Sequence, residues 1–89
     1  VPANYSLEQN YPNPFNPTTT INFSLPKASD VSLKVYDALG NEVMSIVNGF
    51  KNAGTHSVVL NGSDLTSGVY FYKLQAGDFV STKKLTLIK

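Results

Sequence analysis

Apolar and polar residues alternate along several short stretches of this chain. Residues 19–25 place three apolar side chains on one face and polar side chains on the other, and residues 31–35 repeat the alternation after a turn at residues 26–30. A period of two residues is typical of a β-strand with one buried face. Both stretches are therefore predicted to be strands.

The middle of the chain continues this pattern. A turn at residues 37–41 precedes an expected strand over residues 42–47, so the two strands on either side form a hairpin. Asn48-Gly49 predicts a longer loop that runs to Gly54. Residues 56–60 then form the next expected strand, in which alternate side chains are apolar or aromatic.

The two last expected strands differ in character. Residues 68–76 carry aromatic or apolar side chains on both faces, which predicts a central strand. The phase of the final strand, residues 79–88, stays open because Leu85 and Leu87 favour one face while Val80 and Ile88 favour the other. Adjacent lysines 83 and 84 place a charge on each face, which indicates an edge strand that stays accessible to a partner.

Three prolines, Pro12, Pro14 and Pro17, follow the opening segment that begins at Tyr5. Because proline removes a ladder donor, residues 5–17 are expected to form an edge strand or a loop that straps across the domain.

The fold class predicted from these patterns is all-β, an immunoglobulin-like antiparallel β-sandwich of about seven strands, with a small barrel as second choice. No stretch shows a sustained helical period. We expect a single domain over residues 1–89, with residues 1–5 as the end of a linker from a larger protein. The predicted core comprises Ile21, Phe23, Val31, Leu33, Val35, Val43, Val58, Leu60, Tyr70, Tyr72 and Leu74.

Composition narrows the possible functions. The chain has no cysteine, so neither a disulfide nor a thiolate contributes to it. All seven Lys or Arg residues are lysines and the net charge is only +1, which disfavours nucleic-acid binding. No apolar stretch approaches the roughly 20 residues of a membrane helix, so we expect no membrane insertion.

The side chains that carry chemistry are few and scattered. The six acidic residues mostly lie beside turns, where carboxylates cap backbone N–H groups, and His56 is the only histidine. We therefore predict that the domain is not an enzyme and that it holds no cofactor and no catalytic or metal site. A calcium ion bound by turn carboxylates stays an alternative, although no spacing specifies it.

Residues 64–72, with the sequence DLTSGVYFY, have the form of a tyrosine corner. In this arrangement a tyrosine at the start of a late strand returns a hydrogen bond to upstream backbone. We predict that Tyr70 is largely buried and that its hydroxyl bonds backbone between Asp64 and Ser67.

Several segments together resemble the type A C-terminal sorting domains of the bacterial type IX secretion system. They are LEQNYPNPFNP (residues 7–17), TTI (19–21), VYDALGNEV (35–43), AGTH (53–56), LTSGVY (65–70) and KKLTLIK (83–89). The family is similar to the immunoglobulin-like domain of flagellar hook-capping proteins. The resemblance implies a non-catalytic domain at the end of a larger exported protein, which acts together with the type IX translocon and a cell-surface sortase.

On this interpretation the parent protein is secreted or held at the outer-membrane surface of a Gram-negative bacterium, and the domain itself is expected to be a monomer. The family's late motifs point to residues 68–72 and 83–89 as the export signal, with recognition by Gly68, Tyr70, Tyr72, Lys83, Lys84 and Lys89. The alternative is a structural or carbohydrate-binding sandwich attached to a secreted hydrolase. A coplanar row of exposed aromatic side chains would favour that alternative.

Overall fold

The computed structural model describes residues 2–89, which form seven strands in two sheets and contain no helix. The all-β sandwich predicted from the alternation is therefore confirmed. Val1, the first residue of the expected linker, lies outside the described residues. Within residues 2–89 no helix has the length and hydropathy needed to cross a membrane.

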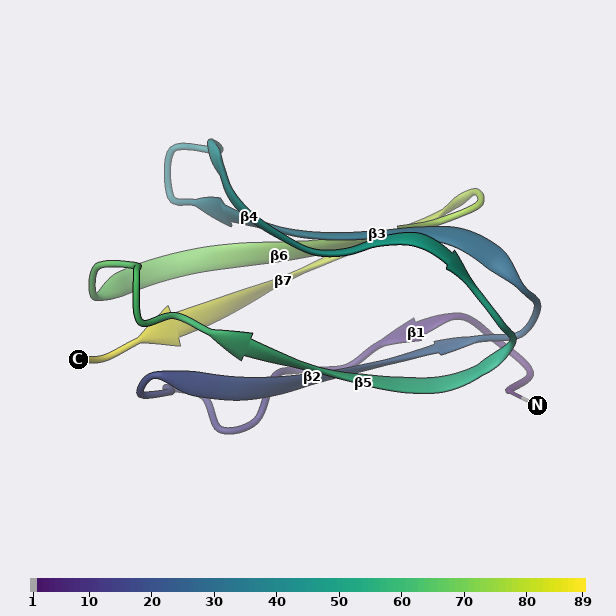
Figure 1. The fold of residues 1–89 in the computed structure, drawn as a ribbon, viewed down its shortest axis with the longest axis horizontal. Helices are drawn as coiled ribbons and strands as arrows, with labels where there is room; N and C mark the ends of the chain where they lie inside the picture. The colour runs from purple at the N-terminus through teal and green to yellow at the C-terminus, as the bar shows by residue number, and fades with distance from the viewer. Residues whose placement is uncertain (1) are drawn as a thin grey trace.

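The seven strands form two layers that face each other (Figure 1). One sheet has the order β1-β2-β5, formed by Ser6–Leu7, Thr18–Leu25 and Gly54–Asn61. The other has the order β4-β3-β6-β7, formed by Glu42–Lys51, Ser29–Asp37, Gly68–Ala76 and Phe79–Leu87. Neighbouring strands are antiparallel, and the chain passes between sheets as it does in immunoglobulin-like folds.

Apolar side chains from both sheets meet in one core. Nine of the predicted core residues are buried there, and Leu33, Val35 and Tyr72 are 0% exposed. Val58 is partly buried and packs against the same cluster. The prediction was wrong for Val43, which is 38% exposed. Register shifts in the β3–β4 ladder, one of them between Val35 and Tyr36, interrupt the alternation of β4 and turn this side chain outward.

β4 is longer than the sequence predicts. The loop expected from Asn48 does not form, because Asn48 pairs with Ser32 and Gly49 with Val31 in a continuous ladder with β3. Gly49 has a φ of 155°, which glycine adopts without strain. The paired backbone therefore outweighs the local turn signal, and the crossing to β5 takes only Asn52 and Ala53.

The structure resolves the phase of the final strand. Leu85 and Leu87 are 0% and 1% exposed, whereas Val80 and Ile88 are 53% and 52% exposed. β7 is an edge strand, as expected, because it pairs only with β6 inside its sheet.

The proline-containing segment forms a strap, which we define as residues 8–17. It leaves β1, pairs with β2 at Tyr11 and Thr20, and then crosses to the other sheet, where Phe15 pairs with Leu87. The strap therefore joins the two sheets along one side of the sandwich. Both the edge strand and the strapping loop predicted for this region are present, in succession.

Candidate functional site: the strap and the last strand

The two late segments predicted to carry recognition lie side by side. β6 and β7 form a hairpin in which Tyr70 pairs with Leu85 and Tyr72 with Lys83. Gly68 is placed opposite Leu87 at the open end of the same hairpin. The fold thus brings the predicted recognition residues of β6 next to those of β7.

Tyr70 forms the predicted tyrosine corner. Its side chain is 6% exposed, and its hydroxyl donates a 2.7 Å hydrogen bond to the backbone carbonyl of Thr66. This contact joins β6 to the loop that precedes it. Tyr70 therefore stabilises the fold, and its ring is not available on the surface.

Tyr72 fixes the strap to the core. Its hydroxyl donates to the carbonyl of Glu8 at 2.7 Å and accepts a 2.8 Å hydrogen bond from the backbone N–H of Asn10. Burial raises the pKa of this phenol, partly offset by the hydrogen bond from Asn10. The sequence placed Tyr72 in the core but gave no indication that its hydroxyl holds a segment 62 residues away.

Asn10 organises the inside of the strap. It is 2% exposed, and its amide nitrogen donates to the carbonyl of Pro12 at 3.1 Å and to the Thr19 hydroxyl at 3.0 Å. Thr19 donates in turn to the same Pro12 carbonyl at 2.8 Å. A buried asparagine needs such partners, because an unpaired amide in the core is costly. This network shapes the strap between its two attachment points.

Phe15 attaches the far end of the strap. The ring is 1% exposed and packs beside Leu87 and Gly62, where a Cβ at Gly62 would lie 3.2 Å from both side chains. Gly62 is thus the residue that leaves room for the ring.

The strap also occupies the outer edge of β7. The backbone of Phe15 donates to Thr86 O and accepts from Ile88 N, both at 3.0 Å. Asn13 Oδ1 accepts from Thr86 N at 3.0 Å, and Gln9 Nε2 donates to Lys84 O at 2.7 Å. The expectation of an accessible last strand therefore needs correction: its backbone is paired from Lys84 to Ile88, and what it presents is side chains.

The three C-terminal lysines lie in different surroundings. Lys84 is exposed on the outer face and Lys83 is half-buried on the opposite face, as the sequence predicts for adjacent strand residues. Lys89 is exposed, and its Nζ donates to Ser63 O at 2.5 Å while its backbone N–H donates to Ser67 Oγ at 3.0 Å. Lys84 and Lys89 are therefore the predicted recognition residues that the surface presents most openly.

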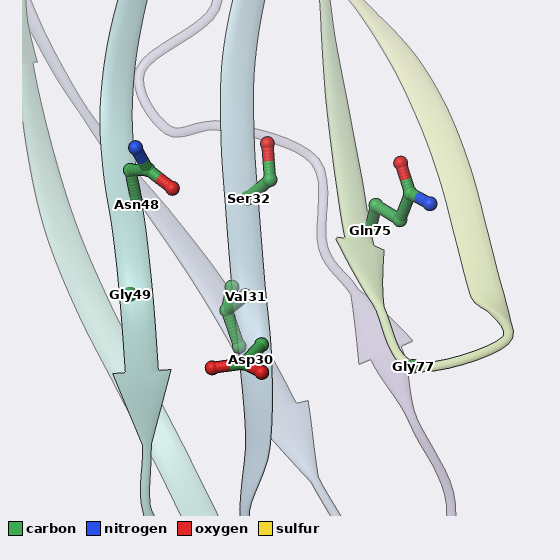
Figure 2. A pocket seen from close by; sticks show the side chains of 7 residues that line it. All are labelled: Asp30, Val31, Ser32, Asn48, Gly49, Gln75 and Gly77. Carbon is green, nitrogen blue, oxygen red and sulfur yellow. The ribbon is translucent and has the colours of Figure 1, made fainter.

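A shallow hollow of about 370 Å³ lies on the outer face of the four-stranded sheet. Figure 2 shows Asn48, Ser32 and Gln75 side by side across β4, β3 and β6, with Asp30 next to them on β3. The residues that line it include no aromatic side chain and no lysine. The hollow thus offers hydrogen-bonding groups without a ring on which a sugar could stack.

The most exposed aromatic side chains are Tyr11 at 81% and Phe50 at 64%, and they lie on the strap and on β4. They belong to different elements and form no coplanar row. Tyr36 and Phe71 are neighbours on the outer face but only half-exposed, with Lys73 Nζ 5.8 Å from the Tyr36 ring centre. This arrangement does not favour the carbohydrate-binding alternative.

His56 lies apart from the hairpin, in β5. Its ring stacks on Phe23 with a centroid separation of 5.2 Å, and its Nε2 lies 2.8 Å from the carbonyl oxygen of Asn52. Among residues 2–89 no group of three or more His, Asp or Glu side chains has metal-binding geometry. His56 therefore has packing and backbone contacts here, and the described contacts give it no hydroxyl or carboxylate partner.

Asp37 shows how the acidic residues are used. Its carboxylate accepts 2.9 Å hydrogen bonds from the backbone N–H groups of Asn41 and Leu39. The bond from Asn41 contributes most to lowering the pKa of this carboxyl. The carboxylate thus caps the turn between β3 and β4, as the sequence predicts for acids beside turns.

Comparison with known proteins agrees with the resemblance seen in the sequence motifs. A family model described as the secretion system C-terminal sorting domain matches residues 9–89, which include the strap from residue 9 onward and all strands from β2 to β7. None of the curated proteins matches the chain.

Proposed function

Because this chain belongs to the family of secretion system C-terminal sorting domains, we propose that it directs export of a larger protein across the outer membrane through the type IX system. The observation that carries the proposal is the match over residues 9–89. The family implies a secreted or cell-surface parent protein and the type IX machinery as partner. Delivery to the outer-membrane surface of a Gram-negative bacterium, and release by a sortase, belong to the proposal.

We further propose that the export information lies in residues 68–72 and 83–89. The family places its late motifs there, and the fold joins the two segments in one hairpin. Tyr70 and Tyr72 support recognition indirectly, since both rings are buried and their hydroxyls hold backbone in place. Lys83, Lys84 and Lys89 supply the charge that a partner would contact.

The test is a reporter protein fused to the N-terminus of this domain in a bacterium with an active type IX system. Deletion of residues 83–89 alone is a poor test, because Leu85 and Leu87 are in the core and their loss would unfold the domain. A sharper variant reverses the charge of Lys83, Lys84 and Lys89 with glutamate. Its matched control reverses Lys27, Lys51 and Lys73, which changes the net charge equally at lysines outside residues 68–72 and 83–89.

The wild-type fusion should reach the medium or the cell surface, and the control should retain export within about twofold, as expected for surface substitutions. The Lys83/Lys84/Lys89 variant should lose export while its unfolding midpoint stays close to that of the control. Full export of this folded variant would remove the lysines from the signal. A wild-type fusion that stays inside the cell would contradict the export function itself.

A further inference from the structure

The two long sides of the sandwich differ in whether the outer edges of their strands have backbone partners. On one side the short β1, the strap and β7 meet, and the strap occupies the backbone edge of β7 from Lys84 to Ile88. On the other side β4 and β5 are the edge strands of their sheets, and each pairs with a single neighbour. The described chain places no strand against either of these outer edges.

β5 leaves a regular ladder of backbone groups free. Gly62 N donates to Pro17 O at 2.8 Å, and antiparallel bonds alternate along a ladder, so the even-numbered residues of β5 bond to β2. The opposite edge of β2 agrees, because Thr20 and Asn22 direct their backbone groups toward Tyr11 and Glu8. The N–H and C=O groups of the odd-numbered residues, from Thr55 to Asn61, therefore point away from the sheet.

β5 also lacks the features that usually prevent an edge strand from pairing with another chain. β4 carries two register shifts and charged residues at both ends, Glu42 and Lys51. β7 carries two adjacent lysines, and the strap covers its edge from Lys84 onward. β5 is eight residues long, has no proline, Asp, Glu, Lys or register shift, and presents Val59 at 66% exposure. A long, regular, uncharged edge is a template for another strand.

We propose that the outer edge of β5 binds an extended, uncharged segment of a type IX translocon polypeptide by strand addition, an inference that rests on the proposed function. The open N–H and C=O groups specify an extended backbone, and the absence of Asp, Glu, Lys and Arg from β5 specifies a neutral segment. Affinity comes from main-chain hydrogen bonds, so one translocon can bind domains that differ in their side chains.

The size of the edge favours a transient partner over a second copy of this chain. Eight residues span about 26 Å, and pairing of two such edges would bury on the order of 600 Å² in total, well below the roughly 1,200 Å² of stable interfaces. An export signal has to be bound and then released. A weak interface of this size suits that cycle, whereas it would not hold a dimer.

Proline scanning tests the edge without altering the core. Val59→Pro removes one outward N–H, and proline is tolerated on an edge strand where its nitrogen faces away from the sheet. Val80→Pro is the matched control: Val80 is an exposed valine on β7, and the alternation set by Ile88 N bonding to Phe15 directs its N–H outward as well. Val59→Ala keeps the backbone N–H and removes only the two methyl groups of the side chain.

All variants are compared as reporter fusions in the same type IX strain, with unfolding midpoints measured on the purified domains. Val59→Pro should lower export by about tenfold or more, whereas Val80→Pro and Val59→Ala should stay within about twofold of wild type. If Val59→Pro does not fold, Val59→Lys places a charge on the same edge and should lower export in the same way.

Full export of a folded Val59→Pro or Val59→Lys variant would overturn the inference and leave the export function intact. Equal losses in Val59→Ala and Val59→Pro would assign the effect to the side chain and overturn backbone pairing. If the domain forms a concentration-dependent dimer that Val59→Pro abolishes, the segment that binds the β5 edge belongs to a second copy of this chain, and a translocon segment is ruled out. Failure of the wild-type fusion to be exported would contradict the proposed function, and this inference with it.

Discussion

Replacing Tyr72 with phenylalanine should separate the strap from the core without changing the packing of the ring. The substitution removes one oxygen atom that makes two hydrogen bonds, to Glu8 O and from Asn10 N. Asn10 is 2% exposed, so its N–H has no access to water when the hydroxyl is lost. An unsatisfied buried donor costs about 1–3 kcal/mol, and the loss of the second bond brings the expected destabilisation to about 2–3 kcal/mol.

The measurement is urea and thermal unfolding of the purified domain. For 89 residues the entropy of unfolding converts this free energy to a fall in Tm of about 11–16 °C. Tyr11→Phe is the control, because Tyr11 is 81% exposed and belongs to the same strap. Its midpoint should stay within about 0.5 kcal/mol of wild type.

The same variant predicts a pH dependence. Burial raises the pKa of Tyr72, so the folded state favours the neutral phenol. That contribution to stability is complete below the unfolded pKa of about 10 and is lost as the pH rises through the higher folded value. Above pH 10 the wild type should therefore lose stability more steeply than Tyr72→Phe. Equal midpoints for Tyr72→Phe and Tyr11→Phe at pH 7 would refute the role given to the hydroxyl.

Two further substitutions test the same side of the sandwich by urea unfolding. Tyr70→Phe should cost about 1–3 kcal/mol. The cost should be less than that of Tyr72→Phe, because the carbonyl that accepts from Tyr70 belongs to the exposed Thr66 and can bind water instead. An unchanged unfolding midpoint would show that the Tyr70 hydroxyl is not used. Gly62→Ala should cost about 1–3 kcal/mol, because the new methyl would lie 3.2 Å from Phe15 and Leu87, both only 1% exposed. A neutral Gly62→Ala would mean that Phe15 packs loosely.

Local alternation was sufficient to predict most strands. Wherever a strand pairs in uninterrupted register, as β2 and β6 do, its period of two residues shows directly which side chains face the core. The prediction failed in β4, where register shifts change the phase at Val43. A bulge depends on how two strands fit together, so the sequence of one strand does not reveal it. The Asn48-Gly49 turn signal failed for the same reason, since β3 supplied partners for that backbone.

The candidate site was predictable only in part. The late motifs located the β6–β7 hairpin, and the sequence around Tyr70 was specific enough to predict a hydrogen bond to backbone within residues 64–67, which the structure places at Thr66. The strap was recognised from its prolines, but its contacts with Tyr72, Thr86 and Ile88 span more than 60 residues. Nothing in the local sequence of residues 8–17 identifies these hydrogen-bond partners.

The unequal sides of the sandwich suggest why the resemblance extends over the whole domain and not over its last residues alone. The final strand has no free backbone edge from Lys84 to Ile88, because Gln9, Asn13 and Phe15 occupy it. The proposed contact of its lysines with a partner thus involves an edge that the strap covers, and Tyr72 holds the strap. An early motif and a late motif are thus parts of one surface. On this view a Tyr72→Phe domain that is folded at low temperature should also export its fusion less well, since the strap would no longer be held against the outer edge of β7.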